Sequence, residues 1–404
     1  MQIITADEPM HLVFEFIKRH SKLIIAILLV ADVCYSFNQH YHAALDGDMS
    51  SIIMPSVAYQ QVLKDPLGLD AFLKNQIYAA PNRFFAHYAM SLYFKNVPLW
   101  LQHFMSPVNS LYAACAIAKT LIQIAMIFLI SVYISGNTKI NSRDFLTAAI
   151  LITPLFHVSG YYIYMGVIDH SITYTFFFAL SLVYLLIYFL PVYLSILKNN
   201  VVKLSLLSRI ILFGLSIVLA FNGPLIPGLV LITCPLILIY YWSNFLKNNY
   251  SDDFIKNALN ALGNVPLQLI YLFAFAMILC GYSLYIGFNN AENFNAVIPV
   301  LNRYMNLPSG LFDMLTTKIG FPLLIIAIAC NYYLILKNAD DDFKSQINKV
   351  MLFIMVFCII YILLLPLGGY RIYRPNIVRR DTFLPVTICM FIIFGYSSLT
   401  VMKL

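Results

Sequence analysis

The chain has 404 residues, of which 61% are hydrophobic and only 11% are charged. A soluble domain carries about 25% charged residues, so this composition excludes an ordinary soluble protein and predicts one that lies mostly in a membrane. The formal net charge of +7 does not indicate nucleic-acid binding, because the lysines and arginines fall in short segments between apolar runs, where they set membrane orientation.

Apolar runs close to the length of a bilayer-spanning helix recur from end to end of the chain. Strands of a membrane β-barrel would show about ten alternating residues each, and the sequence lacks that pattern. We therefore expect an all-α, polytopic membrane protein that forms a single transmembrane domain over residues 1–404. About ten spans are expected, near residues 23–37, 109–134, 145–157, 171–197, 210–222, 225–242, 267–288, 320–336, 350–367 and 383–404.

A basic collar, residues 18–22, precedes the first span. The positive-inside rule places this collar and the amino terminus in the cytoplasm, and ten spans return the carboxy terminus to the same side. The segments 38–108, 289–319 and 368–382 then lie outside. No small-residue cleavage site follows the first apolar run, so no cleavable signal peptide is expected. The interpretation is a bacterial inner-membrane protein whose site faces the periplasm.

The long outer segment 38–108 shows apolar residues at helical spacing over 57–66, 69–78 and 82–94. This pattern predicts amphipathic helices that lie on the membrane surface.

The beginning of that segment carries two carboxylates, Asp46 and Asp48, on either side of Gly47, with His40 and His42 just before them. A sugar hydroxyl has too high a pKa to attack unaided, so a positioned carboxylate could take its proton as a general base. An ordinary Asp-Gly turn or a helix cap is the alternative. The four side chains could also ligate Mg²⁺ or Mn²⁺, and both histidines are candidate substrate contacts.

The last outer segment is rich in cations on the face that should be poor in them: Arg371, Arg374, Arg379 and Arg380. Guanidinium groups match phosphate oxygens through forked hydrogen bonds. These arginines are therefore candidates to bind the phosphate of a polyprenyl-linked donor, and contact with phospholipid headgroups is the alternative.

Charged residues inside a membrane usually face a cavity or each other. Lys119, midway along the second span, is a candidate for contact with the donor phosphate, and a structural ion pair with Asp32 is the alternative. Five further residues near the ends of spans are candidate substrate contacts. The alternative role is interfacial hydrogen bonding for the histidines and the aspartate, and a place in the interfacial aromatic belt for the tyrosines. The five residues are His157, Asp169, His170, Tyr370 and Tyr373.

LDGDMS at residues 45–50, followed by the helices predicted over 51–107, resembles the GT-C class of polytopic glycosyltransferases, which use polyprenyl-phosphate sugars as donors. The resemblance covers the first third of the chain and continues beyond it as a pattern of spans. It implies that Asp46 or Asp48 is the base, with Asp46 favoured because it lies nearer the membrane exit. The chain lacks the large soluble carboxy-terminal domain of many members, which leaves the acceptor open.

The expected function is inverting transfer of a sugar from a polyprenyl-phosphate donor to a lipid-linked glycan or lipid A-type acceptor. One alternative is an O-antigen polymerase or ligase, whose chemistry depends more on arginine and histidine. The other is a transporter or flippase for a lipid-linked solute, which would spread charges along a transmembrane path.

Overall fold

The computed structural model describes residues 7–157, 165–198, 202–248, 263, 265–293, 298–368 and 376–404. Helices account for 79% of the structure, and no strand occurs among the described residues. The predicted all-α membrane class is therefore confirmed.

In the described part of the chain, eight helical segments are long and apolar enough to cross a bilayer. One of them, Ile172–Leu197, is built from α8 (Ile172–Tyr174), a π-helical turn η3 (Thr175–Ala179) and α9 (Leu180–Leu197). The others lie in α1 (Asp7–Tyr41), α6 (Pro107–Ser135), α11 (Leu225–Asn248), α13 (Leu267–Gly287), α16 (Gly320–Asn338), α17 (Asp341–Leu364) with η5 (Leu365–Leu367), and α18 (Arg380–Val401).

Two of the ten expected spans are shorter than a bilayer requires. The segment 145–157 forms α7 (Arg143–Ile152) and one 3₁₀ turn, η1 (Thr153–Phe156), while 210–222 forms α10 (Leu206–Ala220). At 1.5 Å per residue, α7 covers about 15 Å and α10 about 23 Å of a hydrocarbon core about 30 Å thick. Among the described residues, the expectation of about ten spans is therefore corrected to eight helical segments long enough to cross a bilayer and two shorter helices.

The chain between α7 and the next span is irregular over the described residues 165–171. Met165, Val167 and Ile168 in this segment are almost completely buried. Irregular backbone at membrane depth is tolerated where protein encloses it or where it lines a polar cavity. Residues 165–169 are therefore part of the interior of the molecule, and the segment ends at the site described below.

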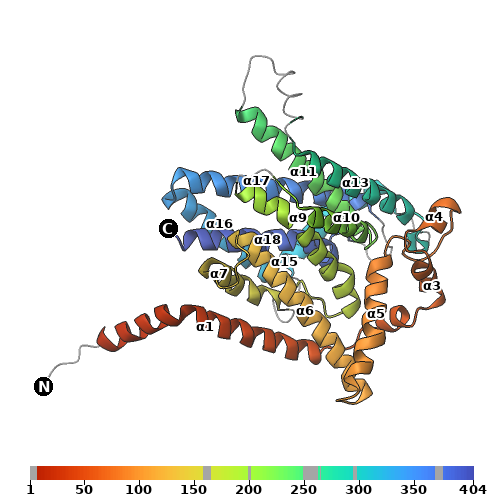
Figure 1. The fold of residues 1–404 in the computed structure, drawn as a ribbon, viewed down its shortest axis with the longest axis horizontal. Coiled ribbons are helices and arrows are strands. Elements are labelled where there is room, and N and C mark those ends of the chain that lie inside the picture. The colour runs from red at the N-terminus through yellow and green to blue at the C-terminus, as the bar shows by residue number, and fades with distance from the viewer. Residues whose placement is uncertain are drawn as a thin grey trace.

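Helices occur where the spacing over 57–94 predicts them, as α3 (Val57–Lys64), α4 (Leu69–Leu73) and α5 (Phe84–Leu101), with a short α2 (Met49–Ile53) before them. They gather at one end of the bundle, opposite the end at which the chain finishes (Figure 1). The second outer segment adds η4 (Ala291–Asn293), α14 (Val300–Met305) and α15 (Leu307–Thr316).

The central helix of the bundle is α6. Ser106 caps its amino terminus by accepting a hydrogen bond from the Asn109 N–H (3.4 Å), and Pro107 occupies the first helical position, where its missing N–H costs nothing. Buried residues make up 72% of its most apolar stretch, against 6% for α1. The helix packs against α1, α5, α7, α9 and α18. Gly395 of α18 permits close packing against α6, because a Cβ there would lie 2.2 Å from the Ile134 Cδ1.

A ladder of polar side chains attaches α1 to α6. The Gln123 amide of α6 donates from Nε2 to the Ser36 Oγ (3.0 Å), and its Oε1 lies 3.0 Å from the His40 Nε2. Ser36 and His40 are one turn apart on α1, and both are buried. Helices that are already in a lipid bilayer gain little from the hydrophobic effect when they associate. Hydrogen bonds of this kind therefore hold a peripheral helix in place.

Replacing Gln123 by Leu should weaken the attachment of α1, since Ser36 and His40 both lose their partner. At about 0.6–2 kcal/mol for each of the two interhelical hydrogen bonds, we expect the free energy of unfolding in detergent to fall by about 1–4 kcal/mol. The exposed Gln102 provides the matched control in Gln102→Leu. Equal stability of the two variants would contradict the role given to the ladder.

Candidate functional site

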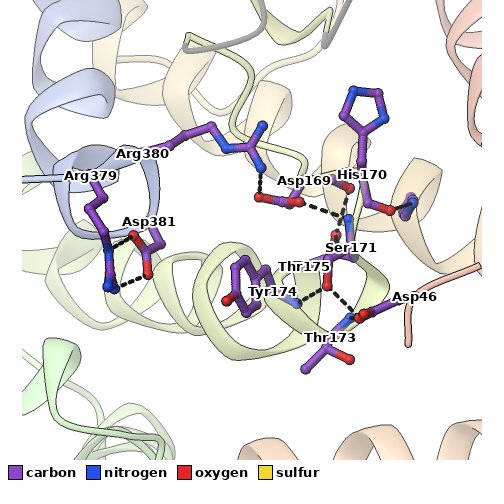
Figure 2. A network of polar contacts seen from close by, with 11 residues as sticks. Asp46, Asp169, His170, Ser171, Thr173, Tyr174, Thr175, Arg379, Arg380 and Asp381 are labelled. Atoms are coloured by element: carbon purple, nitrogen blue, oxygen red, sulfur yellow. Dashed lines mark hydrogen bonds and ion pairs between the residues drawn. The ribbon is translucent and has the colours of Figure 1, made fainter. Parts of the chain in front are cut away.

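The site is built around the start of the span Ile172–Leu197. Ser171 is the N-cap, and its Oγ accepts a hydrogen bond from the Tyr174 N–H (3.2 Å). The Ser171 N–H in turn donates to the Asp169 Oδ1 (2.7 Å). The Thr175 hydroxyl donates to the carbonyl oxygens of both Asp169 (3.3 Å) and Ser171 (3.1 Å). The backbone and side chains of Asp169, Ser171 and Thr175 are thus joined by several hydrogen bonds at this helix start (Figure 2).

Asp46 of the first outer segment binds this cap directly. Its Oδ2 accepts hydrogen bonds from the Ser171 hydroxyl and from the Thr173 N–H (3.2 Å), while its Oδ1 accepts from the Asp48 N–H (3.0 Å). Partial burial of the carboxyl raises its pKa, but the hydrogen bonds from Ser171, Thr173 and Asp48 outweigh burial and hold the pKa below its usual value. Asp46 is therefore an anchored carboxylate that serves as a second cap for the helix.

Asp48 differs from Asp46 in its surroundings. Its side chain is exposed and makes no capping hydrogen bond to α2, which it precedes. Its carbonyl oxygen accepts a hydrogen bond from the Ser51 hydroxyl (2.8 Å), which fixes the backbone. Of the two acids that the sequence indicates, one is tied to the neighbouring segment and the other faces outward.

Of the two described arginines at the start of the last span, one contacts the residues around Ser171. Arg380, the first residue of α18, forms an ion pair with Asp169, whose side chain is largely buried. Arg379 donates from Nε (3.0 Å) and Nη2 (2.6 Å) to the two carboxylate oxygens of the buried Asp381. Figure 2 shows the Arg380–Asp169 pair next to Ser171 and, apart from it, the Arg379–Asp381 pair. Four other predicted residues lie outside the described part of the chain: Arg371, Arg374, Tyr370 and Tyr373.

Lys119 supports the cap from below. It is 2% exposed, and its Nζ donates to the His170 carbonyl oxygen at 2.5 Å. Its charge lies close enough to Asp46 and Asp169 to be attracted by both. The alternative ion pair with Asp32 is wrong, because the Asp32 Oδ1 pairs with the His157 Nε2 at 2.8 Å. Asp32 lies nine residues before Tyr41, the last residue of α1, and is therefore about 13 Å deeper along the helix than Tyr41.

The remaining candidates do not converge on Asp46. The His40 side chain is buried against Gln123, as described above, and His157 belongs to the Asp32 pair. His42 is exposed and its Nδ1 lies 2.9 Å from the Asn38 carbonyl oxygen of its own helix, while the His170 side chain is exposed. Within the described ranges, no three His, Cys, Asp or Glu side chains gather as a metal ligand set. The proposed Mg²⁺ or Mn²⁺ ligands thus do not form a cluster.

Sequence reasoning missed the most connected residue of the site, Ser171. The signal was present, because a serine directly before an apolar run, with Asp169 two residues earlier, is a helix-start pattern. The π-turn η3 that follows was not foreseeable from apolar periodicity. Such turns often mark functional sites because they carry local strain.

Comparison with protein-family models, curated proteins and solved structures finds no match for this chain. The chemistry of the site therefore follows from its geometry alone. Two carboxylates, Asp46 and Asp169, and two cations, Lys119 and Arg380, balance one another within one hydrogen-bonded cluster. A phosphate that enters such a cluster can exchange places with a carboxylate at a guanidinium, and a nearby carboxylate can accept a proton.

Because the folded protein lowers the pKa of Asp46, the charged carboxylate stabilises the fold above the pKa of the unfolded carboxyl, about 3.9. That contribution is lost as the pH falls through the lower, folded-state pKa. We expect Asp46→Asn to reduce the free energy of unfolding at pH 7 and to cost progressively less below pH 4.

Unfolding in detergent between pH 7 and pH 3 measures this difference, with Asp48→Asn as the exposed control. A destabilisation by Asp46→Asn that stays constant over this pH range would show that charge at Asp46 does not support the cap.

Proposed function

We propose that this protein is a GT-C-type glycosyltransferase that moves one sugar from a polyprenyl-phosphate donor to a lipid-linked glycan or lipid A-type acceptor. The observation that carries the proposal is that Asp46, Ser171, Asp169 and Arg380 form one continuous chain of contacts. Acids just after the first span and a guanidinium at the start of the last therefore belong to a single site.

Arg380 is the group that receives the donor phosphate. Its guanidinium is already oriented by Asp169, and it stands at the amino terminus of α18, where the helix dipole favours an anion. A phosphate displaces Asp169 and takes over the forked hydrogen bonds. As the bond to the sugar breaks, negative charge grows on the phosphate and this contact strengthens. Lys119, buried and bound to a carbonyl, holds the segment 165–171 instead of touching the phosphate.

Asp46 and Asp48 have different roles in the transfer step. The acceptor hydroxyl oxygen forms a bond to the anomeric carbon while the bond from that carbon to the phosphate oxygen breaks. The acceptor proton passes to a carboxylate, and polyprenyl phosphate leaves. Hydrogen bonds that hold the pKa of Asp46 down make it a weaker base, so the exposed Asp48 acts as the base and Asp46 positions it. This reverses the preference that proximity to the membrane exit suggested.

The proposed setting is a bacterial inner membrane with the site on the periplasmic face and both termini in the cytoplasm. The basic collar before the first span supports this orientation. The Lys403 Nζ lies 2.6 Å from the Asp144 Oδ2 at the start of α7, so the last helix ends beside a connection far from the Ser171 cap. Membrane lipids and a lipid-linked donor are the partners that this setting implies.

We expect Asp48→Asn to abolish sugar transfer while leaving stability unchanged, because it removes the base and no structural bond of its side chain. Asp46→Asn should reduce transfer and stability together. The measurement is mass spectrometry of envelope glycolipids from a deletion strain that carries the native or variant gene. If the glycolipids of a variant strain are lighter by the mass of one sugar, that mass identifies the sugar that the protein transfers.

Full transfer by the Asp48→Asn, Asp46→Asn and double variants at normal expression would contradict this mechanism. If Arg380→Ala abolished transfer while all the aspartate variants were tolerated, the polymerase or ligase chemistry would replace it.

A second function, transport of a lipid-linked solute, is favoured by the polar face of α1. Asp32, Ser36 and His40 recur every fourth residue within the first span and point to polar partners on other segments. The Asp32 Oδ2 is buried without a hydrogen-bond partner among the described residues. Intramembrane polar chains of this kind mark solute or proton paths. Flux across proteoliposomes with no new glycosidic bond, lost in Asp32→Asn, would establish this function instead.

A further inference from the structure

The end of the bundle away from the Ser171 cap carries a group of cations that the proposed site does not use. Helix α6 begins beside the first outer segment and has 29 residues, so about 42 Å separate its first residue from its last. The connection from α6 to α7 therefore lies beyond the far side of a hydrocarbon core about 30 Å thick. In the proposed orientation this is the cytoplasmic side.

Packing places the connection between α9 and α10 next to the connection between α6 and α7. Gly136 ends α6 with a φ of +64°, and a Cβ at this position would lie 2.3 Å from the Cδ2 of Leu197, the last residue of α9. The Tyr193 hydroxyl of α9 donates to the Tyr133 carbonyl oxygen of α6, and the two rings are 4.5 Å apart. Phe145 of α7 packs in an apolar cluster that includes residues of both α6 and α9. The two connections thus share one surface.

The chain that leads into α10 is held against the bundle. Val202 and Leu204 are 3% and 8% exposed, and the Leu204 N–H donates to the Gln268 Oε1 at the start of α13 (3.2 Å). Lys203 lies between these two buried residues, and its own side chain is exposed. The position of this cation on the outside of the protein is therefore fixed by its neighbours.

Five cations lie on the two connections and on the first turns of the helices that follow, and all five are exposed. They are Lys139, Arg143, Lys198, Lys203 and Arg209. Within the described part of the chain, none of these side chains forms a hydrogen bond or an ion pair. Asp144 is the one acidic residue in 135–144 and 197–210, and it pairs with Lys403 at 2.6 Å. No acid of these two connections therefore balances the five cations.

Exposed apolar side chains lie beside these cations. Four of them, on one side of α10, are 54% to 67% exposed: Leu206, Leu207, Ile210 and Ile211. Leucine side chains favour the hydrocarbon of a bilayer, whereas a long cationic side chain reaches out to water or phosphate. This part of the surface therefore has the composition of a protein surface at the level of lipid headgroups.

The two helices that are too short to cross a bilayer, α7 and α10, both begin at this surface, and Arg143 is the first residue of α7. A short apolar helix is accommodated when the bilayer thins or when flanking side chains extend to the headgroups. Unpaired cations at the start of both helices supply such side chains.

We propose that these five cations form a binding surface for the headgroups of anionic phospholipids, in the leaflet opposite the Ser171 cap. A lipid fits better than a soluble anion because the cations continue directly into exposed apolar side chains, which acyl chains can cover. A headgroup with net negative charge is favoured because a zwitterionic headgroup brings its own ammonium, which the cations repel. This inference does not depend on the proposed function.

The test measures lipid binding to the full-length protein in detergent by native mass spectrometry. The probes are phosphatidylglycerol and phosphatidylcholine with the same acyl chains. Each Lys or Arg near an anionic surface strengthens binding about fivefold, so Lys139→Gln combined with Lys203→Gln should weaken phosphatidylglycerol binding about tenfold or more. Phosphatidylcholine binding should not change.

The matched control is Lys337→Gln combined with Lys344→Gln, which removes two cations from the connection between α16 and α17. That connection carries its own acids, and Asp341 lies 3.8 Å from the Lys344 Nζ. We expect the control to change phosphatidylglycerol binding less than twofold. Lys139→Arg combined with Lys203→Arg keeps both charges and should bind like the native protein.

Unchanged phosphatidylglycerol binding in the Lys139→Gln, Lys203→Gln variant would overturn the proposal. An equal loss in the control would overturn it too, because the loss would then follow net charge and not this surface. If that variant fails to fold, Arg143→Gln combined with Arg209→Gln removes two other cations of the surface and must show the same loss. Sugar transfer is not part of the readout, so either result leaves the proposed function to its own test.

Discussion

The arrangement of the site depends on the exposed N–H groups at the start of the span Ile172–Leu197. The first turn of any helix has N–H groups without partners inside the helix, and next to a membrane interior these need acceptors. Ser171 and Asp46 supply the acceptors, and Asp169 in turn accepts from Ser171. A single helix end thereby gathers the first outer segment, the irregular segment 165–171 and the start of α18.

Charge balance explains why these three segments can come together in a stable arrangement. Burying an isolated charge is costly, whereas opposite charges that share hydrogen bonds offset one another. Asp46 and Asp169 face Lys119 and Arg380, and every one of these groups has a protein partner. In the proposed function, a donor phosphate would therefore have to replace a carboxylate at a guanidinium. Specificity would then arise from how well a ligand reproduces bonds that the protein already makes to itself.

Much of the fold could be predicted from the sequence, because apolar runs and the helical spacing in 57–94 are local signals. The short α7 could not, since hydropathy reports apolar composition but not where a helix stops. The alternative pairing of Asp32 with Lys119 was wrong, because pairing between spans depends on helix depth and rotation. Asp46 and Arg380 were identified as candidates by residue type and place. Ser171 was missed, because a serine beside the start of a helix is common and only its long-range contacts distinguish it.

The π-turn η3 has one more residue per hydrogen-bonded ring than an ordinary helical turn. Below it, α9 is fixed by packing against α6, and above it the cap is fixed by Asp46. Deleting one residue from Thr175–Ala179 would restore a regular helix but turn the cap about 100° away from its acceptors. Along this stretch, natural variation should therefore exchange one apolar residue for another while the number of residues stays constant.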